Sequence, residues 1–186
     1  LRGSGLNGIA SFDKKSQEQN INLIRPLLNF SKKDLKNITK KIFGTYIEDP
    51  SNKDEKYKRV KIRNLINYLQ SEGLDLEKFN LTLKNLKFAN ESIKFFTHKN
   101  VYENSCLDNK NKSIMLNKDF FNNPEEIVFR SFTKVLQFVG KKYYPARGKK
   151  VIKIIDQIKN DSFTKTTLGN CLIKKVNQTI IVSKEH

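Results

Sequence analysis

Arginine and acidic side chains gather in one short stretch, residues 47–63, with the sequence IEDPSNKDEKYKRVKIR. Asp49 and Asn52 stand in a turn-forming segment, and Arg59 and Arg63 follow it four residues apart. On a helix, residues i and i+4 share one face, so the two guanidinium groups would point the same way. Because one guanidinium group can bind two phosphate oxygens at once, this stretch favours binding of a phosphate group. A solvated helix start with surface ion pairs is the alternative.

A second basic stretch, KKYYPARGKK, covers residues 141–150. Tyr143 and Tyr144 interrupt the cations, and aromatic rings among cations are typical of surfaces that bind single-stranded nucleic acid. Pro145 leads into an expected helix whose N-terminus could meet a phosphate. RNA binding and a merely exposed loop both fit this pattern.

Other site chemistries find little support. The two histidines, His98 and His186, and the two cysteines, Cys106 and Cys171, are too scattered for a catalytic triad, a metal centre or a disulfide framework. We therefore expect no metal and two buried free thiols. Residues 3–8 match G-x-G-x-x-G, but a dinucleotide loop needs a strand before it and an acid about 20 residues on, so a flexible turn is the better interpretation.

The charge balance points to a polyanionic partner. Lys and Arg total 36 against 19 acidic residues, a net charge of +17, which attracts phosphate backbones over long range. Codon bias toward Lys and Asn is the alternative, but it does not explain the deficit of acidic residues. With no apolar run of about 18 residues and no signal-like start, we expect no membrane span and a cytoplasmic location.

The first half of the chain has helical signals. The first 20 residues indicate a loop. Ser31 is a good N-cap for a helix that Gly44 would end, followed by a brief strand at 45–47 and a turn at 49–52. Apolar residues at helical spacing predict core-facing helices from about residue 56 to 72 and from 75 to about 96.

The second half adds strands. Residues 99–113 are polar and indicate a loop, and residues 113–116 a strand. Asn123-Pro124 would begin a helix with Asn123 as its cap, ending at Gly140. A helix from about 147 to 159 and short antiparallel strands in 166–183 would follow. The predicted class is α+β, mostly helical, with a small antiparallel sheet in the last third.

The order of short motifs resembles the tRNA(Ile)-lysidine synthase family. The first four are RGSGLNGIA (2–10), LIRPLL (23–28), GTYIEDPSN (44–52) and RVKIRN (59–64). YPARGKK, TTLGNCLIKK and IIVSKE then follow, and they are similar to the family's C-terminal region. The resemblance covers nearly the whole chain, in order.

This resemblance implies a reaction and a domain plan. ATP, with Mg, would adenylate the wobble cytidine of tRNA(Ile) with a CAU anticodon, and L-lysine would displace AMP at C2. Residues 1–52 would end an α/β nucleotide-binding domain, 53–98 would form a helical linker, and 99–186 a C-terminal tRNA-binding lobe. A homodimer is possible.

The resemblance also implies roles for single residues. Arg63 matches a family arginine near the reacting nucleotide and would be catalytic. The substrate cavity would involve Asp49, Ser51, Asn52, Arg59 and Lys61. Residues expected to bind tRNA are Lys141, Lys142, Tyr143, Tyr144, Arg147, Lys149, Lys150, Lys174 and Lys175.

The family's ATP loop would precede Leu1. We therefore expect that these 186 residues alone bind no ATP and form no lysidine, while keeping salt-sensitive tRNA binding. The alternative is a basic helical RNA-binding module without catalysis, which explains the charge but not the ordered motifs.

Overall fold

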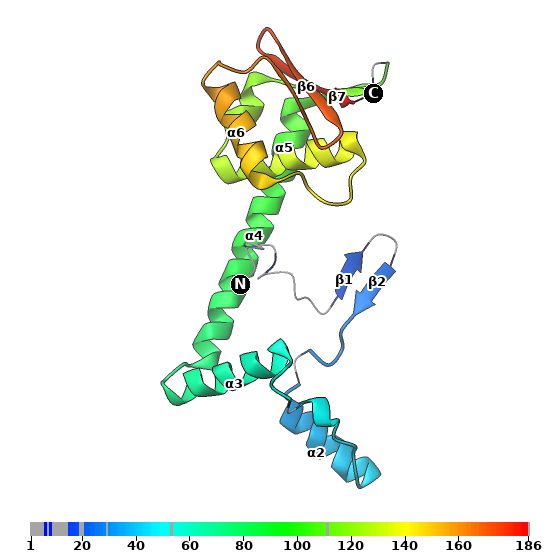
Figure 1. The fold of residues 1–186 in the computed structure, drawn as a ribbon, viewed down its shortest axis with the longest axis vertical. Helices are drawn as coiled ribbons and strands as arrows, with labels where there is room; N and C mark the ends of the chain where they lie inside the picture. Colours follow the sequence, from blue (N-terminus) through cyan, green and yellow to red (C-terminus); the bar gives the residue numbers. More distant parts are fainter. Residues whose placement is uncertain are drawn as a thin grey trace. The chain divides into compact units, whose positions relative to one another are not determined.

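The computed structural model describes residues 6, 8, 15–18, 21–28, 30–52, 54–110 and 112–185. The chain divides into two compact units, residues 1–88 and 89–186, and the long helix α4 (Leu76–Asn104) contributes to both (Figure 1). Each unit is considered by itself below. The predicted α+β class, mostly helical with a small antiparallel sheet, is confirmed.

The first unit contains a two-stranded hairpin. Strand β1 (Lys15–Glu18) pairs antiparallel with β2 (Ile21–Ile24), with Lys15 opposite Ile24. The prediction that the first 20 residues form only a loop is therefore wrong at 15–18. A polar strand has no hydrophobic alternation to reveal it, and backbone pairing with β2 is what makes it a strand.

Helix α2 (Lys32–Phe43) begins and ends where the sequence predicts. The Ser31 hydroxyl accepts from the backbone N–H of Asp34 at 3.1 Å, and the Asp34 carboxylate accepts from the N–H of Ser31 at 3.2 Å. This reciprocal capping box satisfies donors that the first turn leaves free. Gly44, at φ +75°, ends the helix in a backbone conformation that costs a glycine little.

The segment after Gly44 differs from expectation. Residues 45–49 form no strand, and the turn at 49–52 is completed by the short 3-10 helix η1 (Pro50–Asn52). The predicted strand at 45–47 is wrong because no described strand pairs with this segment, and β-branched residues alone do not make a strand.

Helices α3 (Lys58–Ser71) and α4 follow, and α4 is longer than predicted. Residues 99–104 continue the helix and β3 (Ser105–Asp108) comes next, so the expected loop over 99–113 is wrong. The end of the helix was mistaken for a loop because some of its polar residues are buried in the interior of the protein. Buried Asn100 donates to the carbonyl of Phe120 at 3.1 Å, and Thr97 is 1% exposed.

The apolar faces of α2 and α3 are not core in this structure. Ile42 is 67% exposed and Leu65 is 55% exposed, whereas Val60 is the one buried apolar side chain among the described residues up to 88. The prediction that these stripes are core is wrong here, because an apolar stripe is buried only when another element packs on it.

The second unit holds a five-stranded antiparallel sheet in the order β3-β4-β7-β6-β5. Besides β3, its strands are β4 (Ser113–Leu116), β5 (Lys165–Leu168), β6 (Cys171–Val176) and β7 (Thr179–Lys184). The strands predicted in 113–116 and 166–183 are confirmed.

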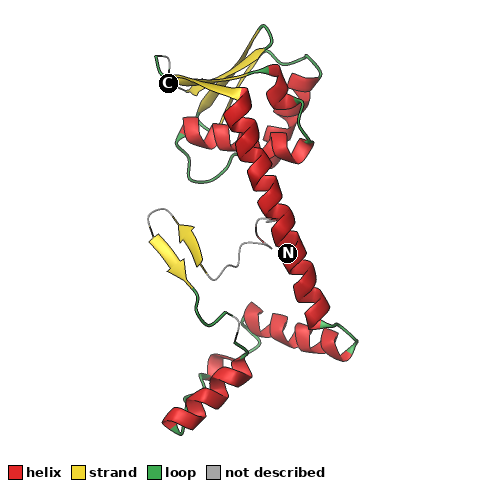
Figure 2. Cartoon of the chain, turned by 180° about the vertical axis from the view of Figure 1, so that it is seen from behind, coloured by secondary structure: helices red, strands yellow, loops and turns green. Residues whose placement is uncertain are grey.

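Two helices and a short turn complete the core of this unit (Figure 2). Helix α5 (Glu125–Gly140) packs against β4, β6 and β7, and α6 (Gly148–Lys159) packs against α5. The 3-10 helix η2 (Lys118–Phe121) inserts two buried phenylalanines beneath them. Inward-facing residues alternate along β6 and β7, as the period of a strand requires.

One detail of α5 corrects the sequence analysis. Pro124 is the N-cap and gives no side-chain cap, whereas the Asn123 amide donates to Asn100 at 3.0 Å and to the carbonyl of Asp119 at 2.9 Å. Asn123 therefore joins the helix start to η2 and α4 instead of capping α5.

Candidate functional site

The turn before α3 is organised by Asp49. Its carboxylate accepts from the backbone N–H of Ser51 at 2.8 Å, and its carbonyl accepts from the N–H of Asn52 at 3.0 Å. The hydrogen bond from the Ser51 backbone lowers the pKa of Asp49, and the Ser51 side chain and the charge of Arg59 lower it further. The turn therefore carries an ionised carboxylate at neutral pH.

Arg59, in the first turn of α3, is directed at this turn. Its Nη2 donates to the Ser51 hydroxyl at 3.2 Å, and its guanidinium carbon lies 5.0 Å from the centroid of the Tyr57 ring. The structure thus brings together three of the residues predicted for the cavity, Asp49, Ser51 and Arg59.

Arg63 and Lys61 stand further along the same helix and are exposed. Arg63 is four residues after Arg59, one helical turn on, so it emerges from the same face. Within the described residues it makes no hydrogen bond or ion pair with the turn at 49–52. The structure therefore does not join Arg63 to the turn that holds Arg59.

A hollow of about 630 Å³ lies between α2 and residues 46–52, and both Asp49 and Asn52 line it. Sequence reasoning missed Lys36 on its wall. The Lys36 ammonium donates to the carboxylate of Glu48 and lies 4.9 Å from the centroid of the Tyr46 ring. The hydrogen bond to Glu48 raises the pKa of Lys36, so the lysine stays charged.

A signal for Lys36 was present in the sequence. Lys32, Lys36 and Thr39 also line the hollow, and they fall at i, i+4 and i+7 of α2, the spacing of one helical face. The polar face of that helix therefore belongs to the same site as the turn. The predicted G-x-G-x-x-G segment at 3–8 lies outside the described residues, apart from positions 6 and 8.

The second unit carries the other basic stretch. Lys141 takes a left-handed conformation at the end of α5, and the Gln137 amide donates to the carbonyl of Tyr143 at 3.0 Å. The rings of Tyr143 and Tyr144 meet edge to face with centroids 4.9 Å apart, and both are exposed. This short connection presents two aromatic rings to solvent.

Two adjoining hollows flank α6 beside these tyrosines. One, of about 290 Å³, is lined by Lys142, Tyr144, Arg147 and Lys150. The other, of about 410 Å³, is lined by Lys150, Lys153 and Lys165. Because Lys150 and Leu168 border both, we treat them as one basic groove, and four predicted tRNA-binding residues lie on its wall.

The remaining residues predicted to bind tRNA lie elsewhere. Lys174 stands opposite Lys165 across β5 and β6 and is exposed, whereas its neighbour Lys175 is half-buried and pairs with Asp161. Adjacent strand residues point to opposite faces, so one groove cannot use both. Lys141, Tyr143 and Lys149 line neither of the two hollows.

One of the two cysteines is buried as predicted and the other is not. Cys171 is buried and its thiol donates to the carbonyl of Leu136 at 3.3 Å, and burial raises its pKa to about 11. Cys106, also expected to be buried, is exposed because it lies on the edge strand β3. In the part of the chain that the structure describes, no His, Cys, Asp or Glu cluster could hold a metal ion. No described helix is long and apolar enough to cross a membrane.

Comparison with known proteins gives two concordant results. Residues 1–69 match the family described as the PP-loop domain. The chain is 32% identical to the tRNA(Ile)-lysidine synthase of Wolbachia pipientis wMel, and the match covers 99% of this chain and 43% of that protein. The corresponding protein of the Brugia malayi Wolbachia is 30% identical over the same shares.

A more distant relative extends the same pattern. The tRNA(Ile)-lysidine synthase of Ruegeria pomeroyi is 25% identical, and the match covers 92% of this chain and 40% of the relative. The chain thus spans about two fifths of the length of these curated relatives. The match extends through both units, and the homologues of this chain are tRNA(Ile)-lysidine synthases.

Proposed function

We propose that the chain forms part of an ATP-dependent ligase that joins L-lysine to C2 of the wobble cytidine of tRNA(Ile). The similarity to lysidine synthases over 99% of the chain is the observation that carries this proposal. The PP-loop match over residues 1–69 supports ATP as the co-substrate. The net charge of +17 suits a tRNA partner.

The turn at 49–52 and the first two turns of α3 would supply fixed positive charge to the reaction. Arg59 is held by the Ser51 hydroxyl and shapes the rim. Arg63, one helical turn on, would meet the reacting phosphate. A cation already in place where negative charge develops lowers the activation barrier, because the protein does not have to reorganise during the reaction. Such electrostatic stabilisation is usually the largest single contribution to catalysis.

The basic groove beside α6 would hold part of the tRNA. Lys142, Arg147 and Lys150 offer cations along it, and Tyr144 offers an exposed ring on which a base can stack. Such contacts need no particular base sequence, so this groove would contribute affinity for tRNA. The choice of cytidine would be made at the reaction site, which includes the turn at 49–52 and the start of α3.

The experiment compares Arg63→Ala with Arg63→Lys and with the exposed α4 control Lys78→Ala in the full-length protein. Lysine incorporation into tRNA(Ile) and tRNA affinity are measured separately. Arg63→Ala should lower kcat by about a hundredfold or more with tRNA affinity kept, and Arg63→Lys should recover part of the rate. Lys78→Ala should match the unchanged protein.

Two outcomes would count against the proposal. An unchanged protein that binds tRNA but never transfers lysine would favour the basic binding module instead. Equal effects of Arg63→Ala and Lys78→Ala would keep the ligase but remove Arg63 from its chemistry. The CAU anticodon, Mg, the homodimer, the cytoplasmic location and the division of the chain into three parts stay predictions.

A further inference from the structure

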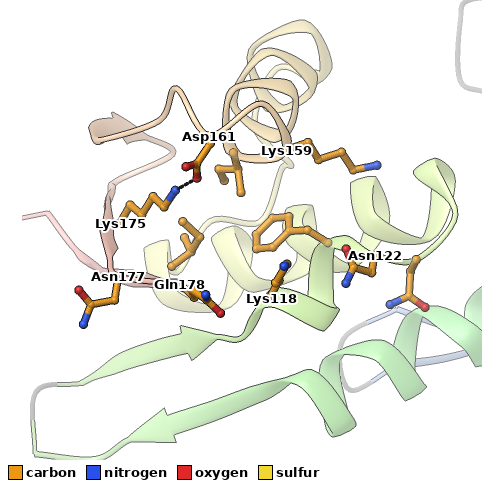
Figure 3. A pocket seen from close by; sticks show the side chains of 11 residues that line it. Lys118, Asn122, Lys159, Asp161, Lys175, Asn177 and Gln178 are labelled. Carbon is orange, nitrogen blue, oxygen red and sulfur yellow. Dashed lines mark hydrogen bonds and ion pairs between the residues drawn. The ribbon is translucent and has the colours of Figure 1, made fainter.

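A separate hollow of about 700 Å³ lies at the far end of α6 (Figure 3). It is bounded by the C-terminal turn of α6, the residues around η2 and the turn between β6 and β7. Lys150 in the basic groove and Lys159 in this hollow are nine residues apart on α6, which is about 13 Å along the helix axis. We call it the α6-end cleft. No predicted site residue except Lys175 lines it.

The cleft is positively charged. Three lysines, Lys118, Lys159 and Lys175, line it with a single acid, Asp161. The hydrogen bond from Lys175 is the main cause that lowers the pKa of Asp161, and the charge of Lys118 also lowers it. The charges of Lys118 and Lys175 therefore both act near Asp161.

The Lys175–Asp161 pair orients one cation without removing it from the cleft. The Lys175 side chain is 22% exposed and that of Asp161 86% exposed, so the acid lies mainly in solvent. Figure 3 shows the Lys175 ammonium pointing at Asp161, with Lys118 rising from below the same hollow. Because water surrounds the carboxylate, the ion pair is worth little, so a phosphate can compete for Lys175.

The floor of the cleft is apolar and its rim carries amides. Phe121, Ile158 and Ile180 line it, and Phe121 and Ile180 are buried. Asn177 and Gln178, which form the turn between β6 and β7, also line it. Asn123 gives both amide hydrogens to Asn100 and Asp119, so its carbonyl oxygen is the atom that can accept from a ligand. Asn and Gln side chains are suited to the edges of heterocyclic bases.

We propose that the α6-end cleft binds one phosphate-bearing nucleotide. The base would lie on the apolar floor with its edge toward the amides, and the phosphate would meet Lys118 and Lys175. Lys159, whose ammonium points away on the other side of the hollow, would add positive charge at the rim. A volume of about 700 Å³ is ample for one nucleotide, and an apolar floor with a few polar groups is typical of small-molecule sites. The nucleotide comes either from the RNA strand, as an unpaired residue, or free from solution. The proposal concerns binding alone and does not depend on lysine transfer.

The test measures ligand binding to the full chain with two probes, free AMP and a short single-stranded RNA of mixed sequence. The variants are Lys118→Glu and Lys159→Glu, both exposed, with Lys110→Glu in the exposed β3–β4 turn as the matched control. Thermal unfolding is followed for each to show that the variants fold. Each cleft variant should weaken binding of the probe that occupies the cleft by about tenfold or more, which is the effect of losing one charge-assisted hydrogen bond.

The two probes separate the two sources. Loss of AMP binding identifies a free nucleotide, and loss of RNA binding with no AMP binding at all identifies a strand residue. Gln178→Ala should then change the preference among the four bases. The cleft does not bind a nucleotide if, for both probes, Lys118→Glu and Lys159→Glu weaken binding no more than Lys110→Glu does. Lysidine formation could still be observed in that case, so the two proposals fail separately.

Discussion

Arg59 donates a hydrogen bond of 3.2 Å from its guanidinium group to the hydroxyl of Ser51, eight residues earlier in the chain. The backbone N–H of Ser51 donates to Asp49, so the arginine is joined to a turn that already holds a carboxylate. A short local network thus aims the first arginine of α3. Nothing buried is needed for this, which means that its effect should be on activity and hardly on stability.

Ser51→Ala tests that network directly. Without the hydroxyl, Arg59 loses its anchor and samples more conformations, so kcat/KM for lysine transfer should fall by about threefold to tenfold in the full-length protein. The unfolding free energy should change by less than about 0.5 kcal/mol, since the site is on the surface. The control is Ser71→Ala at the exposed end of α3. Equal kcat/KM values for the two variants would show that the anchor is irrelevant.

Lys150 borders both hollows of the basic groove, so it should make a phosphate contact. Lys150→Ala should weaken tRNA binding and reduce the slope of log affinity against log salt by about 0.7 to 0.9, because one fewer counterion is released. Filter binding of tRNA at several salt concentrations measures that slope. Lys110→Ala, outside the groove, should leave it unaltered; a slope that does not change in Lys150→Ala places the RNA elsewhere.

Gly140, at the end of α5, lies against the turn between β5 and β6. A Cβ at this position would stand 2.1 Å from the carbonyl oxygen of Gly169, a backbone atom that cannot easily move. Gly140→Ala should therefore destabilise the chain by about 1–3 kcal/mol through overpacking. Gly148→Ala is the matched control, because its Cβ would meet only the Phe129 ring at 3.6 Å, an ordinary contact. Similar unfolding midpoints in chemical denaturation would contradict this geometry.

Cys171 should respond to alkaline pH. Burial raises the pKa of its thiol to about 11, above the ordinary value of 9.0, so the folded state holds this proton more tightly than the unfolded state. The stability contributed is complete below about pH 9 and is lost as the pH rises through about 11. In denaturation curves, Cys171→Ala should lose stability less steeply over this range than the unchanged chain. An identical decline in both would show that Cys171 does not titrate this way.

Thiol labelling gives an independent check on the same residue. A neutral alkylating reagent at mildly alkaline pH should modify exposed Cys106 and leave Cys171 intact until the chain unfolds. Mass spectrometry of the labelled peptides distinguishes the two positions. Rapid labelling of Cys171 in the folded chain would mean that β6 opens readily from α5.

Local signals in the sequence decided much of the helical structure. Helix α2 is capped by Ser31 and Gly44 as predicted, because a capping side chain and a glycine at positive φ act within a few residues of the backbone they satisfy. The strands in the last third were predicted for a similar reason, since β-branched runs and turn residues are local. Composition established the charge, and the ordered motifs indicated the family.

Tertiary structure decided which of those residues meet. The interior role of Asn100 extended α4 past its predicted end, because a polar residue is indistinguishable from a loop residue until its buried partner is known. Lys174 and Lys175 look equivalent in sequence, yet strand alternation and Asp161 place them on different surfaces. Lys118, Lys159 and Lys175 come from three separate elements, and only packing brings them to one cleft. Sequence patterns report local backbone preferences, whereas a site assembled across elements depends on long-range contacts that no local pattern records.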